Sequence, residues 1–336
     1  MLDDTGFQVL ILFASLIGLA SSSHFAIKSV EDIIELTRLS DVSAGFILLS
    51  VLTSAPEILV AFFAIAEGNS AVSVGDVLGS NIFNIALVLG LLGLFGYLKL
   101  CCNDLILDLA DMLSVIALIP LLLLINQFTS YVIPSQIIGL ILLLAFVVNT
   151  ILISKKKAPT IKLVCEKDKC EIKEVKPISE EINDDNKISN FKKIKVITTL
   201  LVSFTIVVIC AQFTVSSASN IAIAFGIPAI LVGAKLVAIG TSLPELTLAI
   251  AAVRRGRVQL AIGGIIGSNL TNLTLVLGLV LIGSPFQVDL IVFLEILPFL
   301  LITSILFWRF VMRGGISRVE GAILLISYIA FLVLVV

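Results

Sequence analysis

Two glutamates occupy closely similar polar motifs within very apolar sequence. Glu57 ends the motif TSAPE, and Glu245 ends the motif GTSLPE. A threonine and a serine precede each glutamate by four and three residues, which places the three side chains on one face of a helix. The proline before each glutamate lacks a backbone N–H and leaves the carbonyl four residues earlier without its helical partner. Within a bilayer, such helix breaks are tolerated mainly where they line a cavity.

A second polar motif follows each of the first ones. GSNIFN spans residues 79–84, and GSNLTN spans residues 267–272. In each, a serine and an asparagine four residues apart share a helix face, and the leading glycine permits the close approach of a neighbouring helix. Asn81 and Asn269 point about 100° away from that face, so we expect them to have a structural role.

All of the candidate ligand atoms in these motifs are oxygens. Carboxylates, hydroxyls, amide carbonyls and freed backbone carbonyls bind hard cations such as Ca²⁺, which takes about 6–8 oxygens, and they also suit Na⁺. Two carboxylates balance one divalent ion, which offsets the cost of burying the three charges together. The predicted metal ligands are Thr53, Ser54, Glu57, Ser80, Asn84, Thr241, Ser242, Glu245, Ser268 and Asn272.

The two sets of motifs belong to an internal repeat. Residues 45–90 align without a gap with residues 233–278 at a fixed offset (245 minus 57 is 188), and 18 of the 46 aligned positions are identical. A single serine or threonine is compatible with simple helix packing. An acid at the centre of a membrane helix costs at least about 2.5 kcal/mol, so we interpret the duplicated glutamates as functional.

The composition predicts a membrane protein. Hydrophobic residues make up 59% of the 336 residues and charged residues 14%, the mean hydropathy is +1.17, and long apolar runs recur along most of the chain. We predict an all-α membrane protein with ten transmembrane helices, arranged as two inverted five-helix repeats with proline-broken helices at the centre. The predicted spans are 7–28, 43–66, 72–96, 105–125, 132–154, 195–218, 229–252, 259–282, 288–311 and 317–336.

A polar segment divides the ten spans into two groups of five. Residues 1–154 form the first predicted repeat, residues 155–193 a linker loop, and residues 194–336 the second repeat. The loop carries mixed charges and is too polar to bury, so we expect it to be solvated. Because each half has an odd number of spans, the second copy enters the membrane from the opposite side. Such inverted repeats are the arrangement that alternating access exploits.

Lysine and arginine fall on alternate loops. The loops near 67–71, 126–131, 219–228 and 283–287 contain neither residue, whereas the intervening loops do. Cytoplasmic loops are enriched in these residues. We therefore predict a multi-pass protein of the cell membrane with both termini outside and the 155–193 loop in the cytoplasm.

The paired motifs resemble the two alpha repeats of the cation/calcium exchanger superfamily, and the similarity is closest to prokaryotic sodium/calcium exchangers. The resemblance covers essentially the whole chain. It implies that Glu57 and Glu245 coordinate Ca²⁺, that Thr53 and Thr241 supply backbone carbonyls, and that Asn84 and Asn272 lie beside the central ion. It implies hydroxyl ligands to Na⁺ from Ser54, Ser80, Ser242 and Ser268.

One feature departs from the pattern of the family. Some members carry an aspartate at one of the positions that align with Asn84 and Asn272, whereas both are asparagine here, which removes a third titratable group. Asp76 lies one turn before Ser80, where the copy has Gly264. We expect a capping or interface role for Asp76, with an outer cation-attracting site as the alternative.

The predicted function is Na⁺/Ca²⁺ antiport by alternating access through a central site built from both repeats. The alternatives are H⁺/Ca²⁺ (or other divalent cation) antiport at the same site and, less favoured, a cation channel. An enzyme is not expected, because metal-protease motifs are absent and His24 is the only histidine; we expect that histidine to pack between helices. The predicted partners are Ca²⁺, Na⁺ and the lipid bilayer, without a cofactor or nucleic acid, and the chain is expected to act as a monomer.

Overall fold

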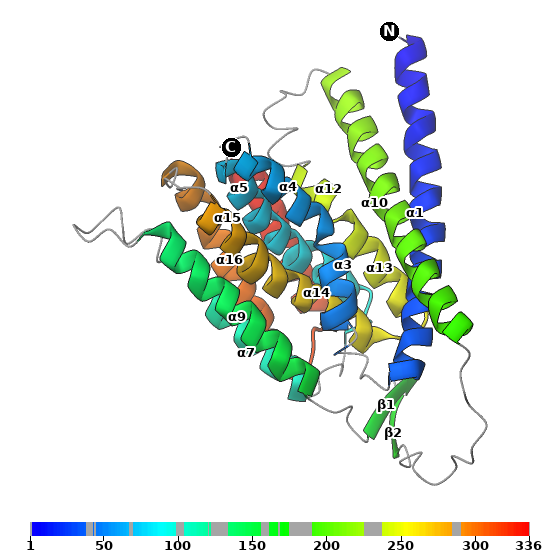
Figure 1. The fold of residues 1–336 in the computed structure, drawn as a ribbon. Coiled ribbons are helices and arrows are strands. Elements are labelled where there is room, and N and C mark those ends of the chain that lie inside the picture. The colour runs from blue at the N-terminus through cyan, green and yellow to red at the C-terminus, as the bar shows by residue number, and fades with distance from the viewer. Residues whose placement is uncertain are drawn as a thin grey trace.

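The computed structural model describes residues 2–37, 43, 45–66, 70–98, 104–119, 121, 134–155, 161–166, 169–174, 190–224, 237–283 and 290–335. Helices dominate these residues (Figure 1). In the first half the elements are α1 (Leu2–Thr37), the π-helical turn η1 (Gly45–Leu49), α3 (Ser50–Thr53), α4 (Ala55–Ala66), α5 (Ser70–Ile82), the π-helical segment η2 (Phe83–Leu89), α6 (Gly90–Leu94), α7 (Asp104–Ile116) and α9 (Ser135–Lys155). In the second half they are α10 (Asn190–Ala224), α12 (Val237–Thr241), α13 (Leu243–Arg254), α14 (Val258–Thr271), η4 (Asn272–Val276), α15 (Leu277–Gly283), α16 (Leu290–Val311) and α17 (Arg318–Leu334).

Helical structure falls within each of the ten predicted spans. Among the described helices, three are long and apolar enough to cross a membrane, namely Ser73–Leu94, Ser135–Ile153 and Val258–Gly283, and shorter apolar helices cover Ile194–Cys210 and Ile296–Val311. Parts of the spans predicted at 43–66, 105–125, 132–154, 229–252, 288–311 and 317–336 lie outside the described residues.

The predicted linker contains a β-hairpin, which adds two strands to the helices expected from the sequence. Strands β1 (Ile161–Glu166) and β2 (Lys169–Glu174) pair antiparallel, with Cys165 opposite Cys170. The sequence of β1 partly alternates apolar and charged residues, a pattern typical of a strand. The hairpin lies at the end of the molecule away from both chain termini (Figure 1).

The two halves share one apolar core and pack against each other reciprocally. Leu78 and Ile82 of α5 and their repeat counterparts Ile266 and Leu270 of α14 are all buried in the same cluster. The long helices α1 and α10 lie side by side at one flank (Figure 1). Elsewhere α5 contacts α12 and α16, while α14, the counterpart of α5, contacts η1, α3 and α7.

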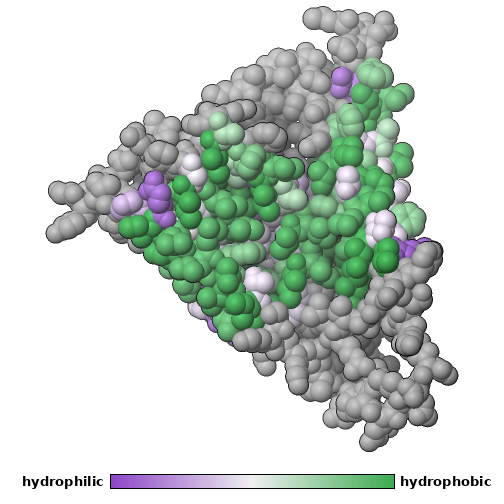
Figure 2. Space-filling model, viewed as in Figure 1, coloured by the Kyte–Doolittle hydropathy of each residue, from purple (hydrophilic) through white to green (hydrophobic). Residues whose placement is uncertain are grey.

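The outer surface is apolar over wide areas. Figure 2 shows hydrophobic side chains covering most of the described surface on one face. Large exposed side chains line α9, such as Leu140 and Leu144, and α17, such as Ile326 and Val333. An apolar surface of this extent does not suit contact with water and is what lipid contact requires.

Contacts between helix ends show which ends share a side of the molecule. The Nε2 atom of His24, near the end of the first predicted span, lies 3.3 Å from Nη1 of Arg255, which follows α13. The backbone N–H of Ile316, before α17, donates to the carbonyl of Leu98, after α6, at 3.0 Å. His24 is exposed and meets the end of α13 only through Arg255, so it is not packed between helices as the sequence had led us to expect.

At the opposite ends of the spans, a second set of contacts occurs. The Ser135 hydroxyl, at the start of α9, donates to the carbonyl of Leu281 in α15 at 3.4 Å. Gly283, at the end of α15, lies so close to Ile65 in α4 that a Cβ atom there would stand 2.9 Å from the isoleucine side chain. Within each of the two sets, the joined helix ends are ones that the charge pattern assigns to the same side of the membrane.

Candidate cation site

Two matched helix breaks carry the glutamates. Ser54 separates α3 from α4 with φ −77° and ψ 3°, and Ser242 separates α12 from α13 with φ −93° and ψ 3°. The proline two residues on cannot donate a backbone hydrogen bond, which explains why both helices stop and restart at the same place. Glu57 and Glu245 lie in the first turns of α4 and α13, where the helix dipole favours a carboxylate.

Crossed hydrogen bonds join each helix break to the other half of the chain. The Thr53 hydroxyl lies 2.7 Å from that of Ser268, and the Thr241 hydroxyl lies 3.2 Å from that of Ser80. These two pairs are exchanged by the repeat, since Thr53 corresponds to Thr241 and Ser80 to Ser268. Residues from both repeats therefore build the cluster together.

Glycines allow this close approach. A Cβ atom on Gly267 would stand 2.8 Å from Cβ of Ser50 in α3, and one on Gly79 would stand 3.0 Å from Cβ of Ala238 in α12. Ala238 is the repeat counterpart of Ser50. The prediction that these glycines permit helix contact is confirmed.

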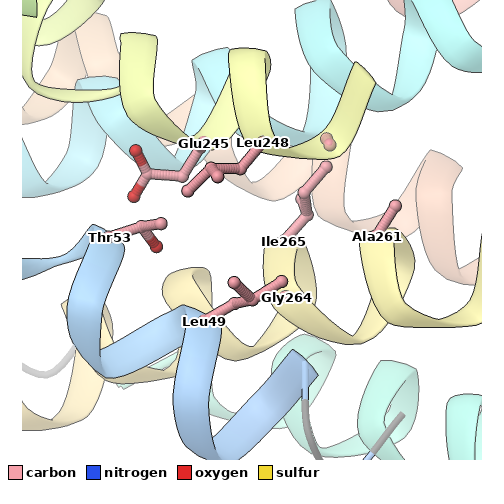
Figure 3. Close-up of a pocket in the computed structure, with 8 residues that line it drawn as sticks. Leu49, Thr53, Glu245, Leu248, Ala261, Gly264 and Ile265 are labelled. Carbon is pink, nitrogen blue, oxygen red and sulfur yellow. The ribbon is translucent and has the colours of Figure 1, made fainter. Parts of the chain in front are cut away.

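The glutamates face each other's half of the molecule. Glu57 and Glu245 are 0% and 3% exposed and repel each other electrostatically. Glu57 lies beside Asn272, and Glu245 lies beside Thr53 and Ser268. Figure 3 shows the carboxylate of Glu245 on α13 turned toward Thr53 across a narrow gap.

Many buried oxygens at this point have no hydrogen-bond partner among the described residues. They include both oxygens of each glutamate, the hydroxyls of Ser54 and Ser242, and the side-chain carbonyls of Asn84 and Asn272. A buried polar group without a partner costs about 1–3 kcal/mol, and more when it is charged. Oxygen ligands of this kind are what hard cations bind, so the donor set fits Ca²⁺ and Na⁺.

The two asparagines occupy matched irregular segments. Asn84 is the second residue of the π-helical segment η2, and Asn272 is the first residue of η4. π-Helical turns inside α-helices frequently mark functional sites, and nothing in the hydrophobic pattern predicted them. The Asn84 amide donates to Oδ1 of Asn269 at 3.0 Å, which turns its own carbonyl oxygen away from that bond. Asn269 thus orients Asn84, although its sequence position predicted that it points away from the ligand face.

Asp76 contributes more to this cluster than its sequence position indicated. The Thr241 hydroxyl donates to Oδ1 of Asp76 at 3.0 Å, so Asp76 joins the two halves. The interface role expected from the sequence is therefore present. Oδ2 of Asp76 and the hydroxyl of Ser73, which the sequence analysis did not single out, are buried without partners among the described residues. The sequence did contain one signal for this part of the cluster, because Asp76 is an acid within an otherwise apolar segment.

A hollow lies beside Glu245. It is lined by Leu49, Thr53, Glu245, Leu248, Ala249, Ala261, Gly264 and Ile265 (Figure 3). In the first repeat, Asp76 corresponds to Gly264 and Ser73 to Ala261. The first repeat thus has a larger, polar pair of side chains where the second repeat has two small residues.

The structure gathers all ten residues predicted as ligands at the meeting point of the two repeats, and their binding of an ion stays a prediction. Among the described residues, no three His, Cys, Asp or Glu side chains come close enough to hold one metal ion. The hydroxyls and amides must therefore supply much of any coordination shell.

Comparison with the sequences of known proteins points to a single family. The family model described as sodium/calcium exchanger protein matches residues 7–155 and 195–336. The chain is 30% identical to the sodium/calcium exchanger MaX1 of Methanosarcina acetivorans over 363 residues, which covers 96% of this chain and 97% of that protein. It is 28% identical to CaxA, a putative antiporter of Alkalimonas amylolytica, over 88% of each chain.

Solved structures give the same picture at the level of the fold. The sodium-calcium exchanger NCX_Mj, in crystals soaked with 10 mM Na⁺ and no Ca²⁺, superposes with a TM-score of 0.75 at 25% identity, covering 97% of this chain and 98% of that chain. Most of the hairpin-bearing segment 155–193 lies between the two stretches matched by the family model.

Proposed function

This chain belongs to the sodium/calcium exchanger family, and we propose that it exchanges Na⁺ for Ca²⁺ at the buried oxygen cluster where the two repeats meet. It is a membrane transporter rather than an enzyme, and its transported ions are Na⁺ and Ca²⁺. Transport of these ions needs no cofactor, because the chemistry is the exchange of water for protein oxygens.

The observation that carries the assignment of the site is the set of unpartnered buried oxygens. Two carboxylates repel each other at the centre of an apolar core without a neutralising group among the described residues. Without a cation, this arrangement is costly in a low dielectric. A Ca²⁺ ion or several Na⁺ ions would neutralise it, whereas the empty site should resist crossing the membrane. That difference couples the movement of one ion to the movement of the other.

The proposed mechanism is alternating access by two inverted five-helix repeats with ten spans. Its support is the reciprocity of the contacts: the crossed pairs Thr53–Ser268 and Thr241–Ser80, and the exchanged packing of α5 and α14. A site bounded by two copies of one element in opposite orientations can be exposed to either side by equivalent movements. We assign the repeats to residues 1–154 and 194–336.

For orientation, we propose both termini outside and the 155–193 loop in the cytoplasm. The hairpin lies at the opposite end from both termini (Figure 1), and the contacts between helix ends agree with the sides assigned by lysine and arginine. The charge pattern alone sets which side is the cytoplasm. We further propose that one chain surrounded by lipid suffices for transport, because both halves of the site are in the same chain.

The test is ⁴⁵Ca²⁺ uptake into proteoliposomes. An outward Na⁺ gradient at fixed pH should drive uptake, and a pH gradient without Na⁺ should not. Uptake that follows the pH gradient and ignores Na⁺ would replace sodium with protons as the coupling ion. Uptake without any counter-ion gradient would indicate a channel.

A further inference from the structure

The inference concerns Asp76 and rests on the proposed Na⁺/Ca²⁺ exchange. Asp76 is 5% exposed, and its Oδ1 accepts a hydrogen bond from Thr241. The Thr241 hydroxyl also lies 3.2 Å from that of Ser80, and Ser80 in turn interacts with Asp76. Ser80, Thr241 and Asp76 therefore form one connected polar group that joins the two repeats. By the geometry of its contacts, Oδ2 of Asp76 has no hydrogen-bond partner among the described residues.

Ser73 provides a second unused oxygen at the same place. It lies three residues before Asp76 on α5, so the two side chains share a helix face, and its hydroxyl is fully buried without a partner among the described residues. Neither unused oxygen is bonded to the other. Two buried oxygens, one of them charged, that both lack a donor form the beginning of a cation shell rather than a hydrogen-bonded cap.

A negative charge at Asp76 would improve the charge balance of the site when several Na⁺ ions bind. Because Asn84 and Asn272 are neutral, the two glutamates supply a charge of −2 at the centre, which matches one Ca²⁺ or two Na⁺. Any further Na⁺ would leave a net positive charge in a low dielectric, which is unfavourable. Asp76 interacts electrostatically with both Glu57 and Glu245, so its carboxylate adds negative charge that would balance one further monovalent ion.

We propose that Asp76 and Ser73 form a separate sodium position beside the glutamates, connected to them through Thr241 and Ser80. The position is separate because the three acids do not converge on one point in the described structure. It exists in one half only, since the repeat has Gly264 and Ala261 at the equivalent places. Na⁺ suits it better than Ca²⁺, because one carboxylate balances one monovalent ion.

The experiment compares the wild-type protein with Asp76→Asn in proteoliposomes. Asparagine retains an acceptor for the Thr241 hydroxyl and removes only the charge. We expect the Na⁺ concentration for half-maximal Ca²⁺ exchange to rise about tenfold, and the Hill coefficient for Na⁺ to fall by about one. Ca²⁺–Ca²⁺ exchange measured without Na⁺ should stay within about twofold of wild type, because the glutamates still balance Ca²⁺.

Asp111→Asn is the matched control. Asp111 on α7 accepts a hydrogen bond from Nε1 of Trp308 at 2.7 Å and is exposed, so the substitution makes the same chemical change at a comparable hydrogen bond outside the cluster. It should leave the Na⁺ dependence unchanged. An equal effect of the two substitutions would mean that the loss of any acid alters exchange, which would overturn the proposal.

The remaining outcomes separate the two proposals. A wild-type protein that shows no Na⁺-driven uptake refutes the exchange function itself. An active wild type combined with an Asp76→Asn variant of normal Na⁺ dependence, or one that loses Ca²⁺–Ca²⁺ exchange equally, refutes the sodium position alone. If Asp76→Asn does not fold, Ser73→Ala decides: a rise of about twofold to fivefold in the Na⁺ requirement supports the position, and no change refutes it.

Discussion

A hollow lies beside Glu245, whereas the equivalent residues of the first repeat are a buried aspartate and a buried serine. Both glutamates follow the same proline break, and both lie against a threonine–serine pair that crosses between the halves. The difference lies one layer away, where Asp76 and Ser73 replace Gly264 and Ala261. The duplication thus preserves the oxygens of the proposed cation site and changes the residues behind them. The proposed site is nearly symmetric in its oxygens but has a polar pair with one acid behind one half and a small apolar pair behind the other.

The largest expected effect tests whether the two copies are equally necessary. Glu57→Gln and Glu245→Gln should each lower Ca²⁺ transport by at least about a hundredfold, because one remaining carboxylate cannot balance a divalent ion at low dielectric. Glutamine fills the same volume, so the folded protein should remain, as size-exclusion chromatography in detergent would show. A folded Glu245→Gln protein with near-normal exchange would contradict the central role of the pair.

The hollow next to Glu245 provides the second test. Gly264→Val would place a branched side chain among Thr53, Glu245 and Ile265, and we expect Ca²⁺ exchange to fall about tenfold because the approach to the carboxylate is narrowed. Gly75→Val is the control on the equivalent helix α5, since nothing lies within 4 Å of a Cβ atom at Gly75. Equal losses in the two variants would show that valine harms these helices in general and that the hollow has no specific role.

A third test compares the two crossed hydrogen bonds by stability. Both Thr241→Val and Thr53→Val remove a contact across the repeats, to Ser80 and to Ser268, and a bond to a carbonyl of the same helix. Thr241→Val in addition leaves Oδ1 of Asp76 without its 3.0 Å donor. Leaving buried polar groups unpaired costs about 1–3 kcal/mol each, so Thr241→Val should lower the thermal unfolding midpoint in detergent more than Thr53→Val does. Equal shifts, or a larger shift for Thr53→Val, would show that the Asp76 bond adds no stability.

These contrasts show which parts of the site were accessible from sequence. The breaks at Ser54 and Ser242 follow from local chemistry, because proline two residues on ends hydrogen bonding wherever it stands in a helix. The grouping of ligands follows from helical spacing and the repeat. The partner of each threonine could not be predicted, since Thr53 and Ser268 are far apart in the chain and their contact depends on how the halves pack.

Other features were missed for related reasons. The π-helical segments at Asn84 and Asn272 change the backbone register without any distinctive residue type. The hairpin at 161–174 lies in a segment whose overall polarity concealed a partial strand alternation. Asp76 was noticed as an acid, but its bond to Thr241 requires the arrangement of α5 against α12. Local pattern located the oxygens, and tertiary packing determined which of them meet.

The smallest expected effect concerns the two serines at the helix breaks. Ser54 and Ser242 have buried hydroxyls without partners among the described residues, and each contributes one neutral oxygen. A divalent ion held by two carboxylates should tolerate the loss of one such ligand better than a monovalent ion does. We therefore expect Ser54→Ala and Ser242→Ala to raise the Na⁺ requirement of Ca²⁺ exchange about threefold to fivefold, with Ca²⁺–Ca²⁺ exchange changed less than about twofold. Titrating Na⁺ for both variants in the same vesicles sharpens the comparison of the halves, because Asp76 has no acidic counterpart in the second repeat. Asp76 is bonded to Thr241, the neighbour of Ser242. If its charge helps to hold sodium there, Ser242→Ala should have the weaker effect of the two. A larger effect of Ser242→Ala would indicate that Asp76 does not help to hold the ion.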